Sequence, residues 1–348
     1  MIRSGIVLAG IVVLDIVNII DHWPSEETLS FIDRTEYAAG GPPHNAAAGL
    51  IKLGAPFPVT LLGASGDDTY GDLMLASARG YGLDTSQVTI IPGAVTSHTH
   101  VMSSADTGKR TFFAQLGVNN VLAVEHLLPR DTNAKLYYLG SPGVARGLDE
   151  SDGWRKLLTA ARQHGMKTCM ELCPVPAEIL RQRVTPCLPL CDYFVVNDYE
   201  AESLTGVALA KDGKLDWQAA ENACRSLLAM GVGTLAAVHH PDGAVAVAAS
   251  GEIAMRPSVN VPAHEIAGSV GAGDAFYAGM LFGIHEDWPL DKCLALGNAA
   301  AATSLHSPTT SASIRPWTEC LAFAQQHGLR AFPAGGLVCE AHYFPGKV

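Results

Sequence analysis

The residues most able to do chemistry form one short stretch, Gly271-Ala272-Gly273-Asp274, directly before an apolar run that predicts a helix. Small residues let a backbone approach a ligand closely. The three amides before Asp274 are expected to point, unpaired, from the helix N-terminus, where the helix dipole also favours negative charge. Such an end can bind a phosphate or charge developing in a transition state. Asp274 could take a proton from a substrate hydroxyl, so the stretch suggests phosphoryl transfer with Asp274 as base.

The same stretch has a purely structural interpretation. Asp at a helix start is a good N-cap, and glycines before a helix are ordinary turn residues. The stretch matches neither G-x-G-x-x-G nor G-x-x-x-x-G-K-[ST], so it lacks the Rossmann and P-loop fingerprints. The catalytic hypothesis therefore depends on residues elsewhere in the chain.

Candidate substrate-binding residues lie near the start of the chain. Asp15 follows the apolar run 6–14, which predicts a buried strand, and ligand sites of open α/β sheets collect at strand ends. Gly40 and Gly41 let the backbone approach a ligand just before a helix that a proline opens. Asn45 can both donate and accept, as recognition of a polyol requires. The structural alternatives are a solvated acid for Asp15 and a local cap for Asn45.

Asn197 and Glu200 directly follow the apolar strand expected at 193–196. Because they are three residues apart at a helix start, both can face the crevice at the strand end. An amide and a carboxylate there could hold water around Mg²⁺, which usually keeps several waters. An Asx followed three residues later by Glu is also a capping box, and both interpretations stay open.

The order of apolar patterns predicts the fold class. After residue 120, strands expected at 135–139, 166–172, 193–196 and 234–239 alternate with helices at 152–164, 177–184, 199–205 and 217–230. This rhythm predicts an α/β fold with a mostly parallel sheet flanked by helices, and segments 243–249 and 252–255 predict an antiparallel edge hairpin. Residues 1–348 are expected to form one domain, with a small β lid inserted from about 16–38 and 96–118.

Composition restricts the partners. The net charge of −11 and the lack of a Lys/Arg cluster argue against nucleic-acid and anionic-membrane partners. An anionic substrate such as ATP would then need a local positive field from helix ends and metal. No segment reaches the roughly 18–20 apolar residues of a spanning helix, so a cytoplasmic protein is expected.

These residues together resemble a known family, the ribokinase-like (PfkB) sugar and nucleoside kinases, over nearly the whole chain. The resemblance rests on four motifs in the family's order: Gly-x4-Asp at 10–15, GGxxxN at 40–45, NxxE at 197–200 and GAGDAF at 271–276. It implies a Rossmann-like α/β domain with a small β lid.

The resemblance also implies roles. Substrate hydroxyls would contact Asp15, Asn45 and the backbone of Gly40 and Gly41. ATP and Mg²⁺ would meet Asn197 and Glu200, with the amides of Gly271, Ala272 and Gly273 as the anion hole and Asp274 as the base. His240, Gly243 and Asn298 would lie on the nucleotide side.

Two segments depart from the family pattern. The family commonly has Asp-Thr-Thr before its GAGD, which helps to hold a monovalent cation, whereas this chain has Gly268-Ser269-Val270, which makes potassium activation doubtful. The strand expected to end in Thr-x-Gly reads Val-His-His-Pro-Asp-Gly at 238–243, so the contacts to nucleotide phosphates must be rebuilt or weakened.

The leading hypothesis is an ATP-dependent kinase acting on a hydroxyl of a small sugar of the ribose, fructose or ketodeoxy-sugar type. Within the kinases, the alternative is a nucleoside kinase. Outside the kinases, the alternative is a non-catalytic sugar or nucleotide binder of the same fold. Apolar aromatics expected on the lid (Phe31, Phe112 and Phe113) predict a homodimer formed through the lids.

Overall fold

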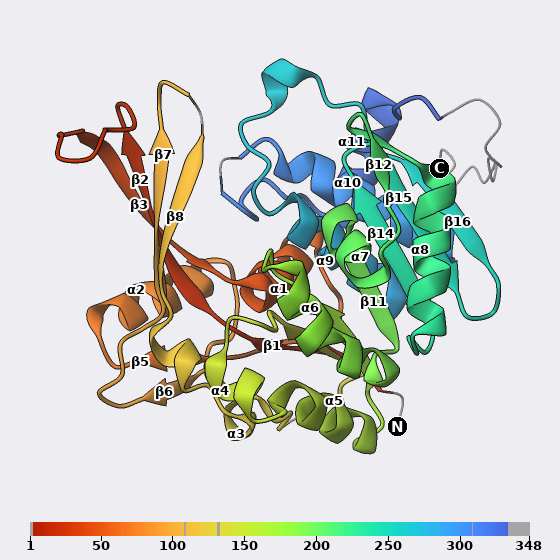
Figure 1. Cartoon of the computed structure of the whole chain (residues 1–348), viewed down its shortest axis with the longest axis horizontal. Helices are drawn as coiled ribbons and strands as arrows, with labels where there is room; N and C mark the ends of the chain where they lie inside the picture. The colour runs from red at the N-terminus through yellow and green to blue at the C-terminus, as the bar shows by residue number, and fades with distance from the viewer. Residues whose placement is uncertain (1–2, 108, 131–132, 308, 333–348) are drawn as a thin grey trace.

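An eight-stranded sheet forms the centre of the computed structural model, which describes residues 3–107, 109–130, 133–307 and 309–332 (Figure 1). The strand order is β16-β15-β14-β11-β10-β9-β1-β4. The parallel strands are β1 (Ile6–Gly10), β4 (Val59–Leu62), β9 (Leu136–Gly140), β10 (Lys167–Glu171), β11 (Tyr193–Asn197) and β14 (Leu235–His240). An antiparallel hairpin, β15 (Gly243–Ala248) and β16 (Ile253–Pro257), completes one edge. The predicted parallel sheet with an edge hairpin is confirmed.

Helices cover both faces of this sheet because successive side chains of its strands enter two separate cores. Leu8 and Tyr138 belong to one core, and Val7 and Tyr137 belong to the other. The first core is covered by α1 (Pro42–Leu53), α9 (Ala272–His285), α10 (Leu290–Ser304) and α11 (Trp317–His327). The second is covered by α5 (Gly153–Gln163), α6 (Ala177–Val184), α7 (Asp198–Thr205) and α8 (Trp217–Ala229). Strands buried on both faces explain the continuous apolar runs in the sequence.

A separate four-stranded sheet stands away from this body at the left of Figure 1. Its order is β3 (Ile32–Gly40), β2 (Val13–Ile20), β7 (His98–Ser104) and β8 (Arg110–Gln115). The single strand expected over 6–14 is wrong, because β1 ends at Gly10 and Val13 already belongs to the second sheet. Asp15 is therefore the third residue of β2 and pairs with Ala38 and Thr99, rather than following the end of a buried strand.

The remaining elements connect these layers. They are β5 (Ala64–Gly66), α2 (Thr69–Gly80), β6 (Thr89–Ile91), α3 (Val124–Leu127), α4 (Arg146–Glu150), β12 (Ala210–Lys211), β13 (Lys214–Leu215) and 3₁₀ helices at Gly117–Asn120, Thr185–Leu190 and Ala263–Glu265. Within the described ranges, no helix combines the length and the apolar character needed to cross a membrane.

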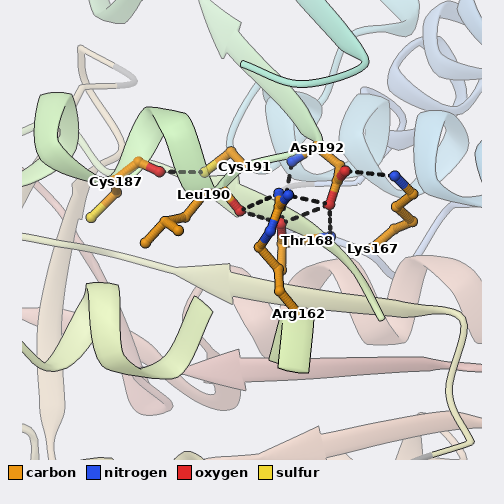
Figure 2. A network of polar contacts seen from close by, with 7 residues as sticks. All are labelled: Arg162, Lys167, Thr168, Cys187, Leu190, Cys191 and Asp192. Carbon is orange, nitrogen blue, oxygen red and sulfur yellow. Dashed lines mark hydrogen bonds and ion pairs between the residues drawn. The ribbon is translucent and has the colours of Figure 1, made fainter. Parts of the chain in front are cut away.

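A buried carboxylate joins β10 to β11 at the ends opposite the candidate site (Figure 2). Asp192, which is 4% exposed, accepts hydrogen bonds from Lys167 Nζ at 2.7 Å and from the backbone amide of Thr168 at 3.0 Å. Arg162 contacts the same carboxylate at 3.4 Å. The network holds in register the two strands that carry Glu171 and Asn197 at their carboxyl ends.

Candidate active site

The first turn of α9 is the centre of the candidate site. Gly271 is the N-cap, with φ of 82°, and a Cβ at this position would lie 2.6 Å from Thr310 Cα, so the turn requires glycine. Asp274 is the third helical residue and not the cap, which excludes the capping interpretation. The amide of Ala272 donates to the carbonyl of Ser269 at 3.3 Å, so the expectation that this amide is unpaired is wrong. The tight turn at Gly271 brings the carbonyl of Ser269 within hydrogen-bonding distance of the Ala272 amide.

The side chain of Asp274 points to α1. Its Oδ2 accepts a hydrogen bond from Asn45 Nδ2 at 3.0 Å. The oxygen of the Asn45 amide in turn contacts Thr310 Oγ1 at 3.2 Å and His44 Nδ1 at 3.2 Å. Because Thr310 and His44 both meet the amide oxygen of Asn45, the amide nitrogen of Asn45 is the atom that faces Asp274. Asn45 lies inside α1, which begins at Pro42, and it is therefore not a local cap.

Gly40 and Gly41 connect Asp15 to the start of α1. A Cβ at Gly40 would lie 2.3 Å from Asp15 Oδ2, so the carboxylate of Asp15 lies against this glycine. Gly41 is the N-cap of α1 with φ of 93°, and a Cβ there would meet the carbonyl of Ile11. Glycine is thus required where the small sheet passes into the central domain.

Four carboxyl groups, two of them buried (Glu171 and Glu200) and two half-buried (Asp15 and Asp274), influence one another around this turn. Burial raises the pKa of Asp274 to about 6, although hydrogen bonds with Asn45 and Glu171 act in the opposite direction. Burial and the nearby charge of Asp274 raise the pKa of Asp15 to about 7. Burial is also the main cause that raises the pKa of Glu200 to about 7, with Asp274 adding to it. The pKa of Glu171 lies well above its ordinary value for the same two reasons.

Asn197 and Glu200 form the capping box that was one of their two interpretations. Asn197 Oδ1 accepts from the amide of Glu200 at 2.8 Å, and Glu200 Oε2 accepts from the amide of Asn197 at 3.0 Å. The box starts α7 at the carboxyl end of β11. Glu200 is 5% exposed and lies near enough to Asp274 for the two charges to interact.

The α9 turn also forms part of the wall of a cavity of about 560 Å³. This volume is typical of a site for a small organic ligand. Ala272 and Gly273 line it, and apolar side chains contribute much of the rest of its wall: Val259, Val261, Ile266, Phe276, Ala301, Ala302 and Leu305. The cavity and the carboxyl cluster therefore meet at the first turn of α9.

The three residues expected on the nucleotide side have different surroundings. His240 lines the cavity, and its ring lies 3.9 Å from the carboxylate of Asp198. Asn298 also lines it, while its amide donates to the carbonyls of Arg256 and Pro257 at 3.1 Å. Gly243 is buried at the start of β15, where a Cβ would lie 2.3 Å from the Trp217 ring, and it does not line the cavity.

Several residues of the site were not predicted from the sequence, among them Glu171, His239 and Arg330. Glu171 ends β10 and hydrogen-bonds with Asp274. Its signal was available, because it is an acid at the end of an apolar strand. His239 and Arg330 line the cavity. Burial lowers the pKa of His239 to about 4, and its ring packs on Phe276 with centroids 4.9 Å apart. Arg330 gave no pattern that sequence alone could separate from a surface residue.

Comparisons with known proteins agree with this arrangement. A family model described as pfkB family carbohydrate kinase matches residues 8–317. The chain is 26% identical over 322 residues to a 5-dehydro-2-deoxygluconokinase of Geobacillus kaustophilus, covering 88% of this chain and 89% of the relative. It is 25% identical over 285 residues to adenosine kinase 1 of Arabidopsis thaliana, covering 79% and 80%. The structure of Arabidopsis thaliana ribokinase complexed with ribose and ATP superposes with a TM-score of 0.73 at 21% identity, covering 93% of this chain and 99% of that one.

Proposed function

Because the chain belongs to the pfkB family of carbohydrate kinases, and is therefore a phosphotransferase acting on a sugar hydroxyl, we propose that it transfers the γ-phosphoryl group of ATP to a small sugar. The sugar is of the ribose, fructose or ketodeoxy-sugar type. The observation that carries the proposal is the position of the α9 turn. Gly273 lines a cavity of nucleotide size. The next residue, Asp274, faces Asn45 and the cluster of carboxyl groups.

In this mechanism the sugar lies between Asp15, Asn45 and the backbone of Gly40 and Gly41. Asp274 accepts the proton of the attacking hydroxyl, whose oxygen forms the new bond to phosphorus while ADP leaves. With a pKa of about 6, Asp274 is ionised at neutral pH and still basic enough for this transfer. The α9 N-terminus stabilises the charge of the transferring group. The small β sheet, whose strand β2 carries Asp15, excludes water as a lid.

Different groups of the site suit ATP and Mg²⁺. The apolar cavity walls suit a nucleobase, and the α9 turn suits the phosphates. Mg²⁺ usually binds one or two carboxylates together with substrate phosphates and water. Glu200, with Asn197 through water, offers that chemistry beside a cluster of acids. The ion would neutralise phosphate charge.

The substitution Asp274→Asn tests the mechanism. It keeps the shape of the side chain and removes the base, so turnover should fall by at least about 100-fold. The dissociation constant of the sugar, measured by calorimetry, should change little. Asp287→Asn is the matched control, because Asp287 is 81% exposed and asparagine also tolerates its φ of 53°. An Asp274→Asn enzyme with more than a tenth of wild-type turnover would refute the role of Asp274.

A nucleoside is the second candidate substrate, and the similarity to adenosine kinase 1 favours it. Sugars and nucleosides are separated by thermal-shift screening in the presence of a non-hydrolysable ATP analogue, because only a bound ligand raises the melting temperature. Turnover assays on the ligands found then identify the acceptor. The family assignment sets aside the non-catalytic alternative.

The proposed enzyme is a homodimer joined through its small sheets. Large apolar side chains are exposed on or beside this sheet, including Phe31, Phe112 and Phe113 at 63%, 56% and 53%. Sheet faces with such residues are usually covered. Sedimentation equilibrium at micromolar concentration should give twice the mass of the chain, and a monomeric mass would contradict the dimer.

A further inference from the structure

His239 lines the cavity beside the α9 turn but has no role in the mechanism so far. It lies near the end of β14, where Ala237 belongs to the first core and Val238 to the second. Because the side chains of a strand alternate between its faces, His239 lies on the face that α9 covers. In register it pairs with Asn197, the N-cap of α7, so these two side chains share that face.

The ring of His239 lies against the first turn of α9. A Cβ at Gly273 would lie 3.4 Å from its Cε1 and 3.7 Å from its Nε2, so this edge of the ring faces the glycine. The ring also packs on Phe276, with centroids 4.9 Å apart and 36° between the ring planes. Phe276 is only 2% exposed and therefore restrains the ring. The imidazole edge is thus held beside the backbone of Gly273.

The two neighbouring histidines differ in their hydrogen bonds. His240 Nδ1 accepts from the amide of Asp242 at 3.0 Å, and its Nε2 lies 3.9 Å from the carboxylate of Asp198. The ring nitrogens of His239 make no hydrogen bond to the residues that the structure describes. His239 is half-buried on the cavity wall, so its polar edge is available to a ligand in the cavity.

A neutral imidazole offers one N–H donor, and phosphate oxygens accept hydrogen bonds. Burial lowers the pKa of His239 to about 4, with Asp198 opposing this effect and His240 adding to it, so the ring is neutral at neutral pH. In the proposed mechanism the phosphoryl group next to Gly273 is the one being transferred, because the following residue, Asp274, is the base. The restrained ring edge therefore faces the position of that group.

We infer that His239 is a catalytic residue whose Nε2–H donates a hydrogen bond to the γ-phosphoryl group of ATP, beside the backbone of Gly273. The inference rests on the proposed function. His239 keeps its proton throughout and acts as a fixed donor to the charge on the transferring group. It supplies a donor in the segment 238–243, where Val238 has no hydroxyl and belongs to the second core.

Three substitutions separate the donor from the ring. His239→Phe keeps a ring that packs on Phe276 and removes the donor. His239→Gln places an amide nitrogen at about the reach of Nε2, whereas the amide of His239→Asn is too short. Because a hydrogen bond to a charged group is worth roughly a ten- to hundredfold change, kcat/KM for ATP should fall by that factor in His239→Phe and His239→Asn, and by less than about threefold in His239→Gln. His164→Phe, at an exposed histidine at the end of α5, is the matched control and should change nothing.

Calorimetry without turnover tests the contact itself. The probes are ADP and a non-hydrolysable ATP analogue that keeps the γ-phosphoryl group, each with Mg²⁺. In His239→Phe the dissociation constant of the analogue should rise roughly ten- to hundredfold, while that of ADP changes little. A merely structural role of the ring would move both constants together or neither.

Each outcome decides the inference. An unchanged affinity for the analogue in His239→Phe would overturn it, and so would an equal loss for ADP and the analogue. A His239→Gln enzyme as impaired as His239→Phe would also overturn it. If His239→Phe does not fold, as judged from its melting temperature, His239→Asn decides by the same measurements. If Asp274→Asn is inactive while His239→Phe is normal, only this inference fails and the proposed function stands.

Discussion

Replacing Glu200 by glutamine should stabilise the ligand-free protein at alkaline pH. Burial raises the pKa of this carboxyl from 4.5 to about 7, so between these values the folded state binds more protons than the unfolded state. Stability therefore falls as pH rises, and the loss is complete above pH 7. Each pH unit between the two pKa values is worth about 1.4 kcal/mol, so the ionised side chain costs at most about 3 kcal/mol.

The glutamine variant isolates this cost because it leaves the capping box in place. A glutamine oxygen can still accept from the amide of Asn197, as Glu and Gln serve equally at this position. Below pH 4.5 both proteins carry a neutral side chain and should be equally stable. Above pH 7.5 the variant should be more stable by up to about 3 kcal/mol.

Urea unfolding at pH 4.5 and pH 8.5, with EDTA and without nucleotide, measures this difference. Glu150→Gln is the control, because Glu150 is 61% exposed and pairs with Arg146 on the surface. Its effect on the free energy of unfolding should be below about 1 kcal/mol at either pH. If the stability difference between Glu200→Gln and wild type were the same at both pH values, Glu200 would not have the raised pKa on which the reasoning depends.

Two further substitutions test the elements that position the site. Asp192→Ala removes the carboxylate of Figure 2 and leaves the Thr168 amide without its side-chain acceptor, so urea unfolding should show a loss of about 2–4 kcal/mol. An unchanged midpoint would show that the network contributes nothing, and Glu150→Ala serves as the surface control. Gly271→Ala places a Cβ 2.6 Å from Thr310 at a positive φ, so it should cost about 1–3 kcal/mol and reduce turnover at least tenfold. Full turnover in this variant would show that the α9 turn need not be tight.

Sequence patterns predicted the central fold well, because buried parallel strands and amphipathic helices have distinct periodicities. The helix expected over 217–230, which is α8 at Trp217–Ala229, and the hairpin of β15 and β16 follow from residues that are neighbours in the chain. The break between β1 and β2, by contrast, could not be predicted from neighbouring residues. Apolar content reports burial but not which sheet buries a residue, so an unbroken apolar run concealed a change of sheet after Gly10.

The candidate site shows the same limit. Spacing alone left Asn197 and Glu200 open between a metal site and a capping box, and the hydrogen bonds of the box appear only with the backbone in place. Gly243 had the expected position along the chain, yet the ring of Trp217 occupies the space beside it. The contact between Glu171 and Asp274 joins β10 to α9, and no local pattern encodes a pairing between such distant segments.

The carboxyl cluster is where the demands of stability and the proposed function conflict most. Asp15, Glu171, Glu200 and Asp274 are mutually unfavourable when ionised, and a chain arranged for stability alone would carry amides or apolar residues there. A hydroxylated substrate and a divalent cation would use these same groups, one as hydrogen-bonding partner and the other as counter-charge. Local rules that fail together at one place commonly mark a functional site. The same substitution, Glu200→Gln, should therefore raise stability and weaken Mg²⁺-dependent nucleotide binding. A variant that was more stable and also bound nucleotide more tightly would argue against a functional origin of the cluster.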